Sequence, residues 1–474
     1  MNTYRIISRL VIAWSAAVAT AVCASGAEPP PVNGPKTPLD EYIAKPDPSY
    51  EWKVVKTIPG DGYTTFVVDL KSQTWRAAPE VDRAVWQHWL VVVKPDTVKH
   101  PTAFLNIGGG RNGSPAPDSA SPQSIGMAKT TNSVVAELKM VPNQPLVLNN
   151  DGTPRSEDDL LAYGWVKFMD TGDPLWIPRL PMVKSAVRAM DTVTALLASE
   201  QGGKADVKNF VVAGGSKRGW TTWLTGAVDK RVVAVVPIVI DVVNVRACSD
   251  NHFCAYGFWA PAIGDYTRHK IHERRDTKEY AALMRIEDPY FYRDRLTMPK
   301  YVVNASGDQY FPPDSSKFYF GDLPGPKFLR YVPNADHSLR GSDAQDGILA
   351  FYQAILAKAA MPKFSWEMAA DGSIRVKAED KPSEVNLWQA TNPKARDFRL
   401  EAIGPAYKKS RLEPGDAGIY VAKVPKPETG WTAFFVELVF DSGGKVPFKF
   451  TTQVSIVPDV LPHKIEEATK PAKQ

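Results

Sequence analysis

One segment constrains the fold of this chain more than any other: an apolar strand that runs through two glycines and a serine straight into a helix. The strand is predicted for Phe210 to Gly214 and the helix for Arg218 to Val228. The next segment, Val232 to Ile240, is almost entirely apolar and β-branched, as expected of a parallel strand covered on both faces. This order predicts a parallel sheet with covering helices.

The same alternation continues on both sides of that segment. Further helices are predicted at Met182 to Leu197 and Gly347 to Lys358, where apolar residues recur at helical spacing. Residues 50–362 are therefore predicted to form one α/β domain. Residues 241–296 interrupt it with aromatic, His and Arg side chains, and we expect them to form an inserted, helical lid. Further strands are predicted at Trp52 to Thr57, Thr64 to Leu70, Ala84 to Val93, Thr102 to Ile107, Ser133 to Met140, Lys300 to Ala305 and Lys327 to Val332.

The pattern changes after residue 363. Runs such as Ser373 to Ala378 and Trp431 to Phe440 alternate between apolar and polar residues and are separated by Gly-containing turns. Short alternating strands at near-regular spacing predict a β-sandwich over residues 363–460. Residues 28–49, which are rich in proline, are expected to be extended, and the charged residues 461–474 are expected to form a flexible tail.

The N-terminal residues are typical of a secretion signal. Arg5 and Arg9 precede an apolar run and then small residues, so cleavage is expected before Glu28. A lipid anchor at Cys23 is an alternative, but the bulky residue before it is unfavourable. No later segment reaches about eighteen uninterrupted apolar residues, so no membrane span is expected after cleavage. We expect residues 1–27 to be removed and the protein to be exported, either periplasmic or secreted.

The charge balance and the cysteines limit the expected partners. The formal net charge is +5, and no basic stripe with interleaved aromatic residues is present, so nucleic acid is not an expected partner. Cys248 and Cys254 are close in sequence, and in an exported protein they are expected to form a disulfide. Unpaired thiols are one alternative, and a metal site with His252 and Asp250 is another, although this set matches no common zinc pattern. No metal or organic cofactor is expected.

The Gly-Gly-Ser turn has the shape that serine catalysis requires. A serine hydroxyl is a weak nucleophile, so it must stand exposed on a tight turn where a base can reach it. Gly-x-Ser between a strand and a helix is the nucleophile elbow of the α/β-hydrolase fold, with Ser216 as the nucleophile. Arg218 stands where a second glycine is usual, so a glycine-rich turn capped by a serine is the alternative interpretation. The predicted fold is therefore an α/β-hydrolase with an inserted lid and a C-terminal β-sandwich.

An acid and a histidine follow in the order that this fold uses. Asp308 and His337 each follow one of the strands predicted above. An aspartate in such a loop accepts the Nδ1 proton of the imidazole and fixes its tautomer. Asp314 is the alternative acid, and Asp336 is expected to be solvated. The other histidines precede Ser216 or lie in the lid or the tail.

Two sources of backbone N–H groups are predicted for the oxyanion hole. The first is Lys217, the residue after the nucleophile at the start of a helix. The second is the loop Gly108, Gly109 and Gly110, where the lack of side chains lets N–H groups approach a substrate oxygen. A purely structural turn is the alternative for this glycine run.

Longer motifs resemble the PhoPQ-activated pathogenicity-related family across nearly the whole mature chain. The resemblance implies an exported protein with an α/β-hydrolase core, and it implies that Arg218 belongs to the usual elbow. It also implies a link to envelope responses and resistance to cationic antimicrobial peptides, and a eukaryotic relative is a secreted proliferation repressor. The motifs are Gly-Gly-Ser-Lys-Arg-Gly-Trp at 214–220, Arg-Leu-Pro-Met-Val-Lys-Ser-Ala-Val-Arg-Ala-Met-Asp at 179–191, Asn-Ala-Ser-Gly-Asp at 304–308, Arg-Asp-Phe-Arg at 396–399 and Gly-Trp-Thr-Ala-Phe-Phe-Val at 430–436.

These features together predict an exported serine hydrolase that cleaves an ester or an amide. A peptide is slightly preferred over a small ester, on the family's link to antimicrobial peptides alone. A likeness of the family to prolyl dipeptidyl peptidases is a further implication, but the paired glutamates that such enzymes use cannot be located here. The alternative is a catalytically silent, secreted binding or signalling protein on a hydrolase scaffold. With either function, the β-sandwich could bind an envelope or cell-surface component.

Overall fold

The computed structural model describes residues 36–415 and 418–469. The predicted signal segment 1–27, with Cys23, lies outside these ranges. Within them, no helix combines the length and the hydropathy that a membrane crossing needs.

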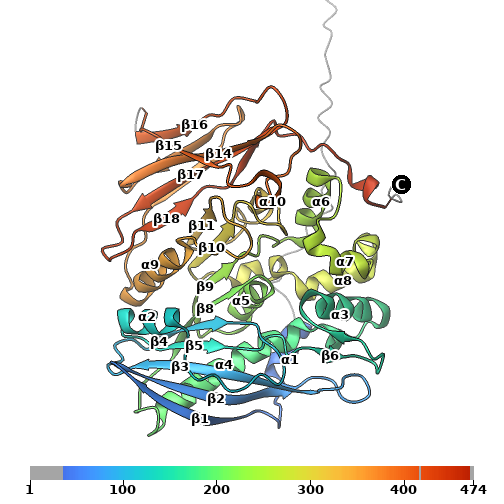
Figure 1. Ribbon diagram of the computed structural model, residues 1–474, viewed down its shortest axis with the longest axis vertical. Coiled ribbons are helices and arrows are strands. Elements are labelled where there is room, and N and C mark those ends of the chain that lie inside the picture. Colours follow the sequence, from blue (N-terminus) through green and yellow to red (C-terminus); the bar gives the residue numbers. More distant parts are fainter. Residues whose placement is uncertain (1–35, 416–417, 470–474) are drawn as a thin grey trace, which may run out of the picture. The chain divides into compact units, whose positions relative to one another are not determined.

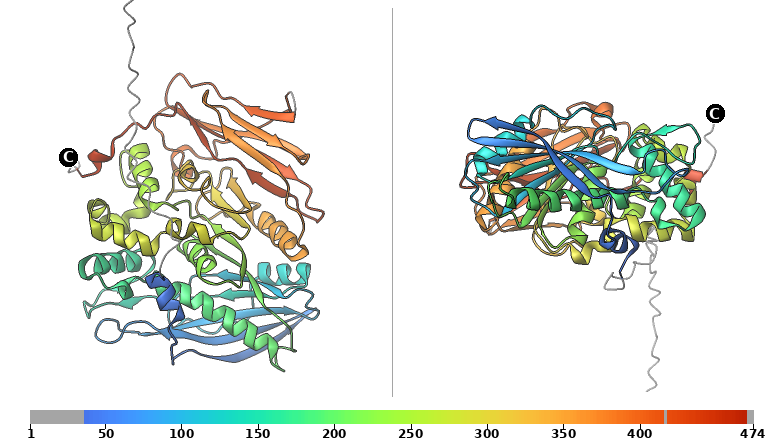
Figure 2. Two further views of the ribbon diagram at one scale, coloured as in Figure 1. Left: turned by 180° about the vertical axis from the view of Figure 1, so that it is seen from behind. Right: turned by 90° about the horizontal axis from the view of Figure 1, so that it is seen from below.

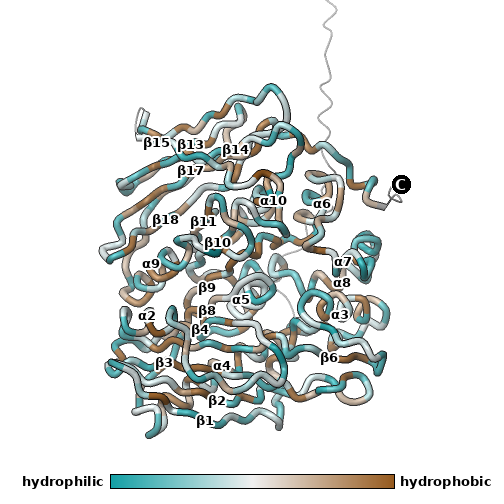
Figure 3. The backbone as a smooth tube through the Cα atoms, in the orientation of Figure 1, coloured by the Kyte–Doolittle hydropathy of each residue, from teal (hydrophilic) through white to brown (hydrophobic). Residues whose placement is uncertain are grey.

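Nine strands of the described chain form the main sheet, in the order β1-β2-β3-β5-β4-β8-β9-β10-β11 (Figure 1). The six strands from β5 to β11 in this order run parallel, whereas β1, β2 and β3 are antiparallel to their neighbours. Hydrophobic residues are concentrated in the strands and hydrophilic residues in the loops (Figure 3). The bounds are β1 Glu51–Gly60, β2 Tyr63–Thr74, β3 Val85–Pro95, β4 Thr102–Ile107, β5 Val135–Leu138, β8 Asn209–Gly215, β9 Val232–Ile238, β10 Lys300–Ala305 and β11 Lys327–Val332.

Helices cover both faces of this sheet. Along β3, Leu90 and Val92 belong to one buried cluster, which includes α1, α4 and α5, while Val91 and Val93 belong to another, which includes α2 and α9. The view from behind shows α1 and α4 in front of the sheet (Figure 2). This is the α/β-hydrolase fold, as predicted from the alternation of strands and helices. The bounds are α1 Pro38–Ala44, α2 Pro122–Thr131, α3 Glu157–Thr171, α4 Arg179–Ala198, α5 Lys217–Val228 and α9 Ala344–Ala357, with β6 Leu146–Val147, β7 Pro154–Arg155 and η1 Pro174–Trp176 between the larger elements.

The segment between β9 and β10 is helical, as expected for residues 241–296. Its helices α7 and α8 lie beside α3 (Figure 1) and contact it. The bounds are α6 Val245–Tyr256, η2 Pro261–Ile263, α7 Gly264–Arg268, η3 His272–Arg274, α8 Lys278–Glu287 and η4 Pro289–Arg295.

The C-terminal strands form two antiparallel sheets that share one buried cluster, which confirms the predicted sandwich. The same cluster includes α9 and β10, and the Tyr301 hydroxyl of β10 donates to the Lys449 carbonyl at 2.9 Å. The sandwich is therefore packed against the α/β part and is not a separate body. One sheet contains β12 Phe364–Met368, β13 Ile374–Ala378 and β16 Ile419–Ala422, and the other contains β14 Glu384–Asn392, β15 Lys408–Arg411, β17 Trp431–Phe440, β18 Phe448–Thr451 and β19 Ser455–Val457.

Two terminal segments differ from the prediction. Residues 28–49 were expected to be extended, but helix α1 forms within them because Thr37 and Asp40 build a capping box. Residues 461–474 were expected to form a flexible tail, but the described part is tied to α6. The His463 N–H donates to the Cys254 carbonyl at 3.1 Å, and the imidazole fits against Gly257 where a Cβ would lie 2.6 Å from the ring. Short elements in the C-terminal half are η5 Ser315–Phe318, α10 Leu400–Ile403 and η7 Ile465–Thr469.

Candidate active site

The candidate residues lie in loops at the carboxyl edge of the parallel strands, where α/β sheets bind ligands. In the register of β4 and β8, Ile107 is opposite Gly214, so the glycine loop after β4 and Ser216 after β8 begin at the same level. Ala305 of β10 is likewise opposite Val332 of β11. The loops that carry Asp308 and His337 therefore also leave the sheet at the same level.

Ser216 stands on a strained turn between β8 and α5. Its φ is +55° and its ψ is −128°, a conformation that residues other than glycine rarely adopt. The strand and helix approach closely, because a Cβ on Gly214 would lie 2.6 Å from the Arg218 carbonyl oxygen, and a Cβ on Gly219 would lie 2.8 Å from the Gly214 carbonyl oxygen. Gly219 therefore allows the close approach, one position later than the usual glycine. Lys217 is the first residue of α5, where a backbone N–H has no partner within its helix.

Asp308 and His337 are hydrogen-bonded to each other. The imidazole Nδ1 donates to Oδ2 of Asp308 at 2.8 Å, and the other carboxylate oxygen, Oδ1, accepts the N–H of Tyr310 at 2.8 Å. The His337 N–H donates to Oε1 of Gln309 at 3.0 Å, which fixes its loop against the acid loop. With Nδ1 donating, the neutral imidazole has its lone pair on Nε2, the nitrogen that a general base uses.

Ser216 lines a cavity, and His337 packs against two residues that line the same cavity. Ser216, Tyr310 and Phe311 line the cavity. The His337 ring lies 4.2 Å from that of Tyr310 and 6.0 Å from that of Phe311, between ring centroids. No hydrogen bond joins the Ser216 hydroxyl to His337 in the described ranges. Catalytic hydrogen bonds are often long without substrate and tighten when it binds.

Asp314, the alternative acid, has other partners. Its carboxylate accepts from Arg396 at 2.8 Å, from Lys317 at 2.6 Å and from Asn251 at 3.2 Å. Burial raises the pKa of this carboxyl, but the two cations hold the pKa well below its usual range. Asp314 is therefore a buried structural anion, and the acid that contacts His337 is Asp308.

The glycine loop after β4 supplies fewer free N–H groups than predicted. The Gly108 N–H donates to the Leu138 carbonyl at 2.7 Å as a continuation of the sheet, which removes Gly108 from the predicted donors. No hydrogen bond from the N–H of Gly109 or Gly110 occurs among the described residues, and both glycines are exposed. A Cβ on Gly109 would lie 2.7 Å from a guanidinium nitrogen of Arg218, so a side chain here would displace the arginine head group.

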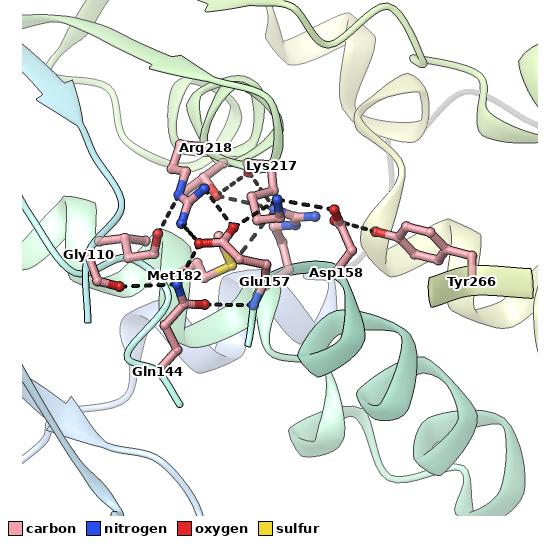
Figure 4. A network of polar contacts seen from close by, with 11 residues as sticks. Gly110, Gln144, Glu157, Asp158, Met182, Lys217, Arg218 and Tyr266 are labelled. Atoms are coloured by element: carbon pink, nitrogen blue, oxygen red, sulfur yellow. Dashed lines mark hydrogen bonds and ion pairs between the residues drawn. The ribbon is translucent and has the colours of Figure 1, made fainter. Parts of the chain in front are cut away.

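A network of charged side chains joins the glycine loop to the elbow (Figure 4). Arg218 makes two hydrogen bonds with the Glu157 carboxylate, at 2.8 and 2.7 Å, and Lys217 pairs with the same group at 2.9 Å. Gln144 donates to the Gly110 carbonyl at 3.1 Å and to Glu157 at 2.5 Å, and its own carbonyl accepts the Glu157 N–H at 2.7 Å. Burial raises the pKa of Glu157, but Arg218 and Lys217 lower that pKa to about 2, so the carboxylate is ionised.

The network extends from the elbow to the lid. Asp158 pairs with the Lys217 ammonium at 3.2 Å and accepts the Tyr266 hydroxyl of α7 at 3.2 Å (Figure 4). Arg179 donates to the Lys217 carbonyl at 2.5 Å and pairs with the buried Glu287 at 3.1 Å. Both cations of the elbow and the buried Arg179 thus have acidic partners.

The predicted disulfide between Cys248 and Cys254 is wrong. Both residues are buried on helix α6 and are not bonded to each other. Six residues along a helix correspond to about 9 Å, whereas a disulfide needs Cα atoms within about 7 Å. Burial raises the pKa of the Cys248 thiol well above its ordinary value, and its Sγ donates to the Val243 carbonyl at 3.2 Å. No group of three potential ligands that could hold a metal ion occurs in the described chain.

Several residues of the site were not identified from the sequence. Glu157, Asp158 and Arg179 surround the elbow, but they lie at least 38 positions from Lys217 or Arg218 along the chain. Their spacing therefore carries no local signal. Tyr310 offered a weak signal, since it follows the predicted acid by two positions in the same loop.

Three solved structures resemble this chain at low sequence identity. The acetyl xylan esterase from Paenibacillus sp. R4 is 16% identical, with a TM-score of 0.47, and the match covers 69% of this chain and 97% of that one. An S-formylglutathione hydrolase from Agrobacterium tumefaciens is 16% identical, with a TM-score of 0.41, over 64% of this chain and 99% of that one. The acylaminoacyl peptidase of Pyrococcus horikoshii is 12% identical, with a TM-score of 0.40, over 65% and 50% of the chains.

Sequence comparison gives a much stronger match. Autocrine proliferation repressor protein A of Dictyostelium discoideum is 37% identical over 458 residues, which cover 90% of this chain and 91% of that protein. The family model of PhoPQ-activated pathogenicity-related proteins matches residues 39–399, which include the elbow, Asp308 and His337. The chain therefore belongs to the family of PhoPQ-activated pathogenicity-related proteins.

Proposed function

We propose that this protein is a serine hydrolase that cleaves an ester or amide bond through Ser216, His337 and Asp308. One observation carries the proposal. The hydrogen bond of 2.8 Å between His337 Nδ1 and Asp308 lies at the same sheet edge as a serine with a φ of +55°. A peptide bond is a slight preference, on the family's link to antimicrobial peptides alone.

The chemistry begins when the Ser216 hydroxyl attacks the carbonyl carbon and transfers its proton to Nε2 of His337. The N–H groups of Lys217 and of Gly109 or Gly110 would donate to the oxygen that gains charge. The imidazolium then protonates the leaving group, and its charge is stabilised by Asp308. Water attacks the resulting acyl-serine, gives its proton to His337 and releases the acid, which regenerates Ser216.

Labelling with a fluorophosphonate probe tests this function, because the probe reacts with activated serines. We expect the mature chain from Glu28 to be labelled and both Ser216→Ala and His337→Ala to lose the label. Ser338→Ala is the matched control, since Ser338 is an exposed hydroxyl beside the histidine. An unlabelled but well-folded wild type would overturn the proposal and favour the catalytically silent binding or signalling protein.

We also propose that the protein is exported after cleavage before Glu28. The support is the pattern of Arg5, Arg9, an apolar run and small residues in the sequence. The test is the mass of the protein recovered from the periplasm or the medium. A product that begins at Glu28 is expected, and a full-length chain retained in the cytoplasm would contradict export.

A second candidate function, binding of an envelope or cell-surface component, is favoured by a cleft between β11 and the C-terminal sheet that contains β14, β15, β17 and β18. The cleft has a volume of about 480 Å³ and is lined by Trp388 among paired charges such as Arg330 with Glu437. In the part of the chain that is described, the Trp388 Nε1 has no hydrogen-bond partner. If the cleft binds such a component, Trp388→Ala will lose retention on isolated envelopes but keep fluorophosphonate labelling. Unchanged retention would count against it.

A further inference from the structure

The cavity beside Ser216 has a defined shape. This shape limits which acyl groups of a substrate can be transferred to the serine. Its volume is about 90 Å³, and its walls are mostly apolar and aromatic. Trp165 and Trp220 form one part of the wall, and Trp259, Tyr266 and Ile271 of the lid form another. The lid therefore closes over the nucleophile and contributes directly to the pocket.

The lid wall is held in place by its own contacts. The Trp259 ring is stacked on the His272 ring, with centroids 3.7 Å apart and planes within 8°. His252 is hydrogen-bonded on both sides: Nε2 accepts the Ala260 N–H at 3.0 Å, and Nδ1 donates to the Tyr310 carbonyl at 3.1 Å. This second bond ties the lid to the acid loop. The cavity is therefore already formed in this structure, with contacts that hold its lid wall.

The charged groups in the wall are already neutralised. Asp158 pairs with Lys217 at 3.2 Å, and Arg179 pairs with Glu287 at 3.1 Å. Burial, with the charge of Arg275, lowers the pKa of His272 to about 4, so this imidazole is neutral near pH 7. A charged ligand group would have to be desolvated here without a free counter-ion, which is costly. The cavity therefore favours an uncharged group.

The position of His337 tells which part of a substrate enters the cavity. His337 does not line the cavity. Its ring lies against those of Tyr310 and Phe311, and these two residues do line the cavity. The imidazolium must deliver its proton to the leaving group, so the leaving group has to stand on the His337 side. The other substituent of the attacked carbonyl, the acyl group, is then directed into the cavity.

The volume limits the length of that acyl group. An apolar cavity of about 150 Å³ holds benzene, which has six carbon atoms. A cavity of about 90 Å³ therefore has room for roughly three methyl-sized groups beyond the carbonyl carbon. We propose that this cavity is an acyl pocket that admits short, uncharged acyl groups of about two to four carbon atoms and excludes longer chains. In a peptide, the same pocket would receive a small side chain of the residue that supplies the carbonyl.

The acyl pocket rests on the proposed serine hydrolase function. Its test must therefore distinguish a failure of the pocket from a failure of the hydrolase function. The substrates are p-nitrophenyl acetate, butyrate, hexanoate and octanoate, each measured as kcat/KM with the mature protein from Glu28 and with its Ser216→Ala variant. We expect acetate and butyrate to be hydrolysed best, and octanoate to be at least about tenfold worse, because each poorly fitting methylene costs about that factor. Ser216→Ala should hydrolyse none of them above background.

Ile271→Ala tests whether the lid wall sets the length limit. Ile271 is buried and lines the cavity, so its truncation should improve hexanoate relative to butyrate by about fivefold or more. Ile271→Val, which removes a single methylene, should shift the profile less and in the same direction, and it is more certain to fold. Leu283→Ala is the matched control, since Leu283 is equally buried on α8 but does not line the cavity.

The outcomes are distinguishable. If the wild type is neither labelled by fluorophosphonate nor active on any ester, the hydrolase function itself is wrong. If it is labelled but prefers octanoate, or is labelled and hydrolyses none of the short esters, the hydrolase function stands and the acyl pocket is wrong. An unchanged length profile in both Ile271 variants would likewise overturn the assignment of the pocket.

Discussion

Nδ1 of His337 lies 2.8 Å from Oδ2 of Asp308, although the two residues are separated by 29 positions in the sequence. The relationship exists because β10 and β11 are adjacent and parallel and end at the same level. The carboxylate is held at its second oxygen by the Tyr310 N–H, and the histidine loop is held by Gln309. Three hydrogen bonds from two short loops thus fix one imidazole orientation.

Asp308→Asn should reduce kcat by about 10³- to 10⁴-fold, the size of effect seen when a triad carboxylate becomes an amide. An amide can donate to Nδ1 and stabilise the wrong tautomer, while it leaves the local packing unchanged. The measurement is kcat on a reactive ester together with the rate of fluorophosphonate labelling. Asp336→Asn is the control, because its carboxylate contacts Ser338 and not the imidazole. A kcat within about threefold of wild type for Asp308→Asn would contradict the assignment.

Glu157→Gln should lower kcat more than it raises KM. Glu157 holds Arg218, Lys217 and Gln144 together, and Gln144 holds the Gly110 carbonyl, so the substitution should loosen the glycine loop to which we assign an oxyanion donor. We expect kcat to fall by about 10- to 100-fold. This loss is smaller than the loss caused by removing a hydrogen-bond donor of an oxyanion hole. Glu80→Gln is the control, because it removes one partner of an arginine pair with Arg76, away from the cavity. Equal kcat values for the two variants would assign Glu157 to stability alone.

Much of the fold could be predicted because its signals are local. The helix predicted at Arg218 to Val228 is α5, Lys217–Val228, and the strand predicted at Val232 to Ile240 is β9, Val232–Ile238. Hydrophobic periodicity and the glycines specify these elements without any long-range contact. The sequence order of the candidate residues Ser216, Asp308 and His337 could also be recognised from local signals, because each residue follows a predicted strand.

Other features could not be predicted because they depend on distant contacts. Helix α3 has apolar residues at helical spacing, but its N-cap, Ser156, makes no capping hydrogen bond and Glu157 has a φ of +55°. The role of Glu157 follows only from its position beside Arg218, 61 residues away. The disulfide could have been rejected earlier, since a helical lid places Cys248 and Cys254 six positions apart on one helix, which is too far.

Gly214→Ala should destabilise the protein far more than Gly215→Ala. An added Cβ on Gly214 would lie 2.6 Å from the Arg218 carbonyl oxygen, within the first turn of α5, whereas one on Gly215 meets nothing within 4 Å. Overpacking of this kind costs about 1–3 kcal/mol. The measurement is the free energy of unfolding from denaturant titrations of both variants. Equal stability of the two variants would contradict the close approach of β8 and α5 at the elbow.

Asp241 should make the protein less stable as the pH rises from about 4 to 8. It is fully buried and accepts the hydroxyl of Tyr319 at 2.7 Å and that of Tyr331 at 2.5 Å. Burial raises the pKa of this carboxyl to about 8, against an ordinary value of 3.8. The folded state therefore retains a proton that the unfolded state loses above pH 4. Folding is favoured by this group at low pH, and the stabilisation is lost as the pH rises through the folded pKa.

Asp241→Asn isolates this effect, because the amide resembles the protonated carboxyl and does not titrate. The free energy of unfolding of the variant, minus that of the wild type, should be flat below pH 4 and should then rise by up to about 1.4 kcal/mol per pH unit towards pH 8. Other buried titrating groups cancel in this difference. Tyr319→Phe is the control: it removes one hydrogen bond but leaves the Asp241 carboxyl in place, so its stability should run parallel to that of the wild type. A difference between Asp241→Asn and wild type that does not change with pH would mean that Asp241 is ionised in the folded protein, and that the two tyrosines bind a carboxylate.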